Sequence, residues 1–185
     1  MKLVMGLGNP GSKYVGTRHN VGFAVLAEVA RVHGQGKPKL AFQGEAVEAN
    51  LVGVRTLLLC PHTFMNRSGI SVFKALEFYK LTHDDLLVVC DDFHLPLGKL
   101  RFRAKGSSGG QKGLNDIIRQ LGTEDFSRLR LGVGEPPAGW DAAAFVLSKF
   151  SKQEMPEVDL AVKFAADAVR DWAALGIADC MNRYN

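Results

Sequence analysis

Long apolar runs are missing from this 185-residue sequence. The longest strongly apolar run, Leu86 to Cys90, is far shorter than the roughly 20 residues that a membrane-spanning helix needs. The chain also enters a strand-like segment at its start, without the pattern of a signal peptide. We therefore expect a soluble protein that does not cross a membrane and is not exported.

Cysteine is scarce, and the common metal-binding motifs are absent. Cys60, Cys90 and Cys180 cannot all pair, which argues against a disulfide framework and favours a location in the reducing cytoplasm. The sequence contains no CxxC, no HExxH and no Asx-rich calcium loop. We therefore predict neither a metal nor another cofactor.

Acidic residues are missing from one internal stretch. No Asp or Glu lies between Asp92 and Asp116, although the net charge of the whole chain is only +4. The basic residues of this stretch are Lys99, Arg101, Arg103, Lys105 and Lys112. The first four alternate with apolar residues, so a strand would place them on one face. A glycine-rich loop follows, and we interpret the stretch as a phosphate-binding face, with a merely solvated strand face as the alternative.

The hydrophobic pattern predicts one α/β domain over residues 1–185. With 46% hydrophobic residues the chain can bury one core, but it is too short for two ordinary domains. Apolar runs of strand length lie at Leu3–Met5, Thr56–Leu59, Leu86–Cys90 and Leu129–Val133. Apolar residues at helical spacing predict helices over about 21–32, 69–79, 113–121 and 153–175. In the first helix this apolar stripe includes Val32. Alternation of strands and helices is typical of the α/β class.

Two glycine-rich motifs suggest functions that their context does not support. Gly6, Gly8 and Gly11 match the dinucleotide-binding pattern GxGxxG, but no helix begins directly after them. The segment Gly106–Gly110 matches the nucleophile-elbow pattern GxSxG of α/β-hydrolases. Those enzymes place the catalytic histidine after the serine, whereas all five histidines here precede Ser108. We interpret both segments as loops.

Polar side chains follow three of the predicted strands. Asn9, Asn66 and Asp91 each come shortly after an apolar run. Sites in open α/β sheets gather beyond the carboxyl ends of the strands. If these strands are parallel neighbours, the three side chains share one cleft.

His19 is the candidate general base for this cleft. It lies between the N-terminal glycine-rich turn and the first predicted helix, so its ring can project from a helix N-terminus. Asp91 could orient the ring and stabilise its protonated form after proton transfer. Since no serine or cysteine is a credible nucleophile, water would attack, with Asn9 and Asn66 as amide donors to a carbonyl or oxyanion. The alternatives are a capping or surface role for His19 and turn chemistry for the asparagines.

Several blocks of the sequence together resemble the bacterial peptidyl-tRNA hydrolase family. They are GLGNPGSKYVGTRHNVGF (Gly6 to Phe23), PHTFMNRSG (Pro61 to Gly69), DD followed by LPLG (Asp91 to Gly98), RLRLGVG (Arg128 to Gly134) and the final NRYN. The blocks occur in the family's order and cover essentially the whole chain. The resemblance implies a twisted, mostly parallel mixed sheet flanked by helices. It also implies a monomer that hydrolyses peptidyl-tRNA released from stalled or aborted translation.

The resemblance also implies roles for individual residues. His19 matches the catalytic base, Asp91 its supporting carboxylate, and Asn9 the residue that helps to distinguish peptidyl-tRNA from unblocked aminoacyl-tRNA. The residues that match contacts to the tRNA end and the substrate are Tyr14, Phe64 and Asn66, with Met65 lining the cleft. Arg130 and a base between Arg103 and Lys105 match the clamp on the 5′-phosphate of the tRNA.

The sequence departs from the family in the loop before the third helix. Most members have GGHNG there, whereas this chain has GGQKG, with Gln111 and Lys112. Lys112 could meet a phosphate or hydroxyl, but it cannot take over the amide role of the family's asparagine. His94 likewise stands where the family usually has an acidic residue. The altered loop favours one alternative, a non-catalytic RNA-binding factor on the same fold; a hydrolase for another ester or amide is a third.

Overall fold

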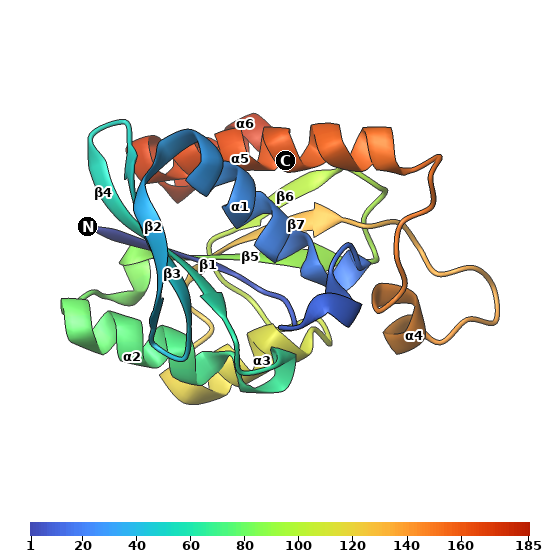
Figure 1. The fold of residues 1–185 in the computed structure, drawn as a ribbon, viewed down its shortest axis with the longest axis horizontal. Helices are drawn as coiled ribbons and strands as arrows, with labels where there is room; N and C mark the ends of the chain where they lie inside the picture. The colour runs from blue at the N-terminus through green and yellow to red at the C-terminus, as the bar shows by residue number, and fades with distance from the viewer.

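The predicted apolar runs form the centre of a seven-stranded sheet. In a computed structural model that describes residues 1–185, the strand order is β2-β3-β4-β1-β5-β7-β6 (Figure 1). The strands are β1 (Lys2–Gly6), β2 (Gly34–Ala41), β3 (Gly44–Leu51), β4 (Val54–Pro61), β5 (Leu86–Asp92), β6 (Leu100–Arg103) and β7 (Ser127–Gly132). All seven strands belong to this one sheet, and the predicted mixed α/β fold is confirmed.

The middle of the sheet is parallel. β1 pairs in parallel with β4 on one side and with β5 on the other, and β5 pairs in parallel with β7. The carboxyl ends of the three strands that precede the predicted polar clusters therefore lie at the same edge. This arrangement fulfils the condition under which those clusters share a cleft.

The two flanks of the sheet are antiparallel. β2, β3 and β4 form a meander on one side, and β6 pairs with β7 on the other. Strands β2 and β3 were not predicted from the sequence. Their connecting turn uses Phe42 and Gln43 at φ of 52° and 57°, where the glycine or asparagine of a recognisable hairpin turn is missing.

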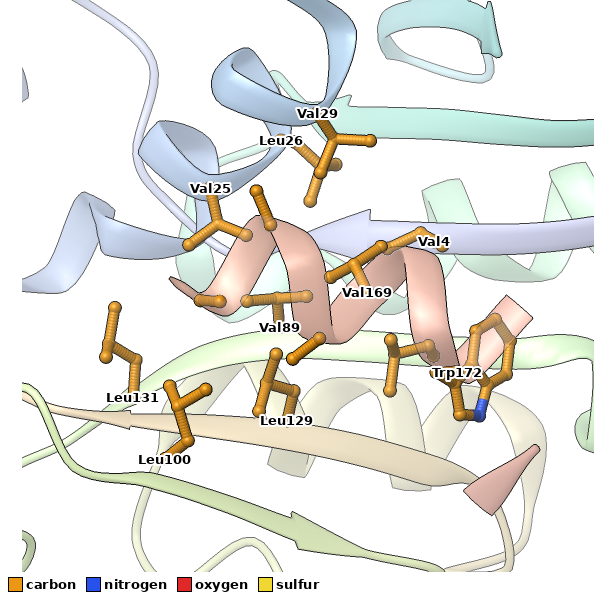
Figure 2. Close-up of a cluster of buried hydrophobic side chains, with 14 of the residues drawn as sticks. Val4, Val25, Leu26, Val29, Val89, Leu100, Leu129, Leu131, Val169 and Trp172 are labelled. Carbon is orange, nitrogen blue, oxygen red and sulfur yellow. The ribbon is translucent and has the colours of Figure 1, made fainter. Parts of the chain in front are cut away.

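Helices cover both faces of the sheet (Figure 1). On one face lie α1 (Val21–His33), α5 (Met155–Leu175) and α6 (Ile177–Tyr184), and on the other lie α2 (Gly69–Tyr79) and α3 (Lys112–Leu121). Figure 2 shows the core under α1 and α5, where Val25, Leu26 and Val29 meet Val169 and strand residues such as Val89. Burial on both faces explains why the central strands read as continuous apolar runs instead of alternating ones.

The helices agree closely with the predicted ranges. The four predicted helices correspond to α1, α2, α3 and α5, with the start of α5 two residues later than expected. Val32 was placed on the buried stripe of α1, but it is 54% exposed because the helix runs past the edge of the core there. α6 and the five-residue helix α4 (Ala142–Val146) were not predicted. None of the helices is both long and apolar enough to cross a membrane.

Candidate active site

A cavity of about 610 Å³ lies at the carboxyl edge of the parallel strands. The predicted residues that line it are Asn9, His19, Phe64, Met65, Asn66, Asp91, Lys112 and Arg130. They come from segments up to 121 positions apart in the sequence, from Asn9 to Arg130. The fold thus brings most of the predicted site into one cleft.

His19 is held at the entrance to α1 by a single turn of 3-10 helix, Arg18–Asn20. Its Nδ1 lies 2.9 Å from each carboxylate oxygen of Asp91, at the end of β5. The exposed fractions of the two side chains are 11% and 2%. An ionised carboxylate only accepts hydrogen bonds, so Nδ1 carries the proton and Nε2 keeps its lone pair for the cavity. This is the geometry of a base held by an orienting carboxylate.

Asn9 is fixed by a reciprocal contact with Asn20. The backbone N–H of Asn9 donates to Asn20 Oδ1, and Asn20 Nδ2 donates to the backbone carbonyl of Asn9, both at 2.9 Å. Asn9 Oδ1 accepts the backbone N–H of Met65 at 2.8 Å. Since its oxygen is already engaged, Asn9 has its Nδ2 group free to donate into the cavity.

The aromatic side chains lie at the mouth of the cavity. Phe64 is 52% exposed and has a φ of 59°, which turns the chain toward the short 3-10 helix Met65–Arg67 that carries Asn66. Tyr14 packs edge-on against Phe64, with ring centroids 6.5 Å apart. Tyr14 therefore adjoins the rim without lining the cavity.

The predicted basic stretch Lys99–Lys105 contains β6, which pairs with β7. Their register pairs Arg101 with Arg130 and Arg103 with Arg128. Arg130 reaches the cavity, where it contacts Asp92 Oδ2 at 3.2 Å and the carbonyl of Ser107 at 3.2 Å. Arg103 and Lys105 are exposed and lie outside the cavity lining.

Arg128 was not predicted as a site residue, but it supports the glycine-rich loop. Its side chain is fully buried and donates to the carbonyls of Gly106, Ser107 and Glu124. Burial, together with the neighbouring charge of Arg130, lowers the pKa of the Arg128 guanidinium. An arginine inside an apolar strand would have been the signal for such a support, because buried arginines need several acceptors.

α4 forms the cavity wall that sequence reasoning missed. Asp141, Ala142, Ala143, Val146 and Leu147 line the cavity from this segment. Asp141 caps the helix by accepting the backbone N–H of Ala144 at 2.9 Å. An aspartate directly before three alanines was the available signal for this helix start.

No serine, threonine, cysteine or tyrosine is among the residues that line the cavity. Cys90 is adjacent to Asp91 in the chain, but burial raises the pKa of its thiol to about 12 and keeps it in the core. No group of three or more His, Cys, Asp or Glu side chains is arranged to hold a metal ion. A histidine–carboxylate pair in a cavity without a hydroxyl or thiol side chain is suited to a hydrolase that activates water.

Comparison with known proteins agrees with this class. A model of the peptidyl-tRNA hydrolase family matches residues 3–185. The peptidyl-tRNA hydrolase of Rhodopirellula baltica is 50% identical over 185 residues, covering 100% of this chain and 97% of that protein. The one of Desulfitobacterium hafniense is 46% identical over 188 residues, with both chains fully covered. The crystal structure of peptidyl-tRNA hydrolase from Acinetobacter baumannii superposes with a TM-score of 0.91 at 34% identity, covering 100% of this chain and 94% of that one. The chain belongs to the peptidyl-tRNA hydrolase family.

Proposed function

We propose that this protein hydrolyses the ester that joins a peptide to the 3′ ribose of tRNA, and so recycles tRNA from prematurely released peptidyl-tRNA. The observation that carries the proposal is the buried His19–Asp91 pair, with Nδ1 2.9 Å from the carboxylate, in a cavity that is lined by no hydroxyl or thiol side chain. An ester is the bond best suited to such a site, because water activated by one base can displace an alkoxide.

The chemistry follows from the positions of the side chains. His19 Nε2 removes a proton from water, whose oxygen attacks the ester carbonyl, while Asp91 stabilises the imidazolium that forms. The free Nδ2 of Asn9 donates to the carbonyl oxygen as it gains negative charge, and Asn66 offers a second amide donor. When the tetrahedral intermediate collapses, the ribose 3′-oxygen leaves and takes the proton from His19.

The remaining predicted residues would hold the tRNA. Tyr14, Phe64 and Met65 present apolar surface on which the terminal base or the peptide could stack. Lys112 would meet a phosphate or hydroxyl at the cavity, and Arg103, Lys105 and Arg130 would contact the 5′-phosphate end. The protein would act as a monomer in the cytoplasm, a location supported by its three unpaired cysteines.

The test is release of free tRNA from N-blocked aminoacyl-tRNA by the purified protein. We expect the wild-type protein to release tRNA. The rate of release by His19→Ala should be about 10²–10⁴-fold lower, as for loss of a general base. His33→Ala is the matched control, because His33 lies at the opposite end of α1. Near-full turnover by His19→Ala would exclude the mechanism.

The same assay also tests an alternative function. The GGQKG loop is the feature that favours a non-catalytic RNA-binding factor on this fold. Such a factor would bind tRNA but release none of it from the blocked aminoacyl ester. Competition by bare tRNA distinguishes a tRNA-directed hydrolase from one that acts on other esters or amides.

A further inference from the structure

Asp91 has a second side-chain partner besides His19. Its carboxylate is almost completely buried, and a buried charge is stable only where donors surround it. The Nε2 group of Gln111 donates to Asp91 Oδ1 at 3.2 Å. The same carboxylate is therefore held from two elements, by the turn that carries His19 and by the start of α3.

The orientation of the Gln111 amide is set by its two neighbours. Gln111 is the N-cap of α3, and its Oε1 accepts the backbone N–H of Leu114 at 2.8 Å. Its Nε2 faces the carboxylate of Asp91 and the sulfur of Met65, which is 3.3 Å away. A flipped amide would place oxygen against carboxylate and an NH₂ group against an N–H, so only one orientation satisfies both ends.

We propose that Gln111 is a positioning residue that aligns Asp91 with His19 and links this alignment to the first turn of α3; the inference rests on the proposed hydrolysis. An uncharged donor suits this task. It restricts rotation of the carboxylate without adding a positive charge that would compete with His19 for it. The glycine-rich loop ending at Gly110 precedes this cap, so the cap that starts α3 also completes the support of the base.

Two substitutions separate the contact with Asp91 from the cap. Gln111→Ser keeps an N-cap acceptor for Leu114, but its side chain is too short to reach Asp91. Gln111→Glu keeps both the cap and the length, and it replaces the donor by a carboxylate. We expect Gln111→Ser to lower kcat by roughly 10-fold with KM within about twofold, and Gln111→Glu to lower it further, as for removal of a hydrogen bond to a charged group. The midpoint of thermal unfolding should stay close to that of the wild type in Gln111→Ser and should fall in Gln111→Glu, which places a second carboxylate beside the buried Asp91.

A conservative variant and a double-mutant cycle test the same contact. A neutral imidazole has one acceptor and one donor, so Gln111→His should recover turnover to within about threefold of the wild type. In an Asp91→Ala background, followed in single-turnover experiments, Gln111→Ser should change the rate by less than about twofold, because its partner is gone. Independent, additive effects would mean that Gln111 acts through general stability and would overturn the proposal.

The outcomes also separate this inference from the proposed function. A wild-type protein that releases no tRNA would overturn the hydrolase function and the positioning role with it. An active wild type whose kcat is unchanged in both Gln111→Ser and Gln111→Glu would overturn only the role of Gln111. Reduced kcat in both variants, with rescue by Gln111→His and loss of the effect in Asp91→Ala, would support it.

Discussion

Asn9 illustrates how a side chain in a loop becomes a directed donor. Its two backbone polar groups pair with Asn20, and its Oδ1 pairs with the backbone of Met65. These contacts fix both the position of the residue and the orientation of its amide. The group left for the substrate is an NH₂ donor, which is the type that a developing oxyanion needs.

Asn9→Asp tests this donor separately from the structural contact. Aspartate keeps an oxygen for the N–H of Met65 but places negative charge where the carbonyl oxygen becomes negative. We expect kcat/KM on N-blocked aminoacyl-tRNA to fall about 10²–10³-fold, with little change in thermal unfolding. Asn50→Asp is the matched control, since Asn50 also accepts a backbone N–H, from Gly53, in a turn away from the cavity. Equal effects of the two substitutions would contradict the assigned role.

Individual site residues differ in how far the sequence could predict them. The proximity of His19, Asn9 and Asp91 was predictable because each lies at or near the end of an element whose type the hydrophobic pattern defines. The contact of Gln111 with Asp91 was not predictable, because it depends on the side-chain conformation at the start of a helix. For the same reason, the contacts of Arg130 with Asp92 and with the loop carbonyl could not be derived from its place on a strand.

At the scale of elements, α1 packs directly on the backbone of the sheet. A Cβ atom added at Gly22 would lie 2.5 Å from the backbone N and O of Leu7 and 2.6 Å from the carbonyl oxygen of Val89. These are backbone atoms in or next to the central strands, and moving them would disrupt the pairing of the sheet. The start of α1, and with it His19, is therefore set by the absence of a side chain at Gly22.

Gly22→Ala should displace this helix from the sheet. We expect the free energy of unfolding to fall by about 1–3 kcal/mol, the usual cost of overpacking, and turnover to fall as well because His19 moves. Ala24→Gly, on the exposed side of the same helix, should lose about 1 kcal/mol from helix propensity and keep its activity. Urea unfolding and tRNA release measure the two quantities. Full activity of Gly22→Ala would contradict the packing argument.

A second link joins the turn of His19 to the start of α5. The buried guanidinium of Arg18 makes two 2.9 Å contacts with the carboxylate of Glu154 and donates to the carbonyl of Val133 at 2.8 Å. It also lies between the rings of Phe145 and Phe150, at 4.4 and 4.6 Å from their centroids. The hydrogen bonds from Arg18 lower the pKa of Glu154 from its ordinary value of 4.5 to about 2.

This pair should give stability a defined pH dependence. Because the folded state lowers the pKa of Glu154, its contribution is complete above about pH 4.5 and is lost as the pH falls toward 2. Glu154→Gln should reduce the free energy of unfolding at pH 7 by about 1–2 kcal/mol, allowing for the partial exposure of the carboxylate. The difference from the wild type should shrink below pH 4.5 in urea titrations. Glu48→Gln, which breaks an exposed pair with Arg55, should change stability little at any pH. A Glu154→Gln deficit that stays constant down to pH 2 would be inconsistent with this account.

Two of the elements that sequence reasoning missed, β2 and α4, lack a long buried apolar stripe. β2 is exposed along seven of its eight residues, and α4 has only five residues. Without a buried face, the spacing of apolar residues does not indicate whether a segment is a helix or a strand. The turn at Phe42 also lacks a recognisable turn sequence. The central strands and long helices were predictable because burial dictates their composition.

At the scale of the whole molecule, the two edges of the sheet differ in how close their basic residues lie to the proposed active site. The β6 edge carries Arg103, with Lys105 just beyond it, and β6 pairs with β7, which carries the cavity-lining Arg130. The β2 edge carries Lys37 and Lys39 at the far side of the sheet. Only the first edge is continuous with the proposed active site, so charge there can orient a tRNA while charge at the other edge cannot.

Replacing Arg103 and Lys105 by glutamine should therefore weaken tRNA binding. We expect the slope of log Kd against log salt to decrease by roughly one for each phosphate that the protein no longer neutralises, with hydrolysis of a minimal N-blocked ester unchanged. The matched control removes the same charge through Lys37→Gln and Lys39→Gln at the other edge. Equally weakened binding in the two double variants would show that total charge, and not the β6 edge, attracts the tRNA.

The lack of a hydroxyl or thiol among the cavity-lining residues bears on how the protein could be blocked. Drugs and reagents that acylate serine or alkylate cysteine need such a group to attack, and they would find none at this site. An inhibitor of this site that does not target an amine or imidazole would rely on reversible affinity, filling the pocket and matching the fixed amide of Asn9 and the ring of His19. Potency would then come from residence time in the pocket rather than from a covalent bond.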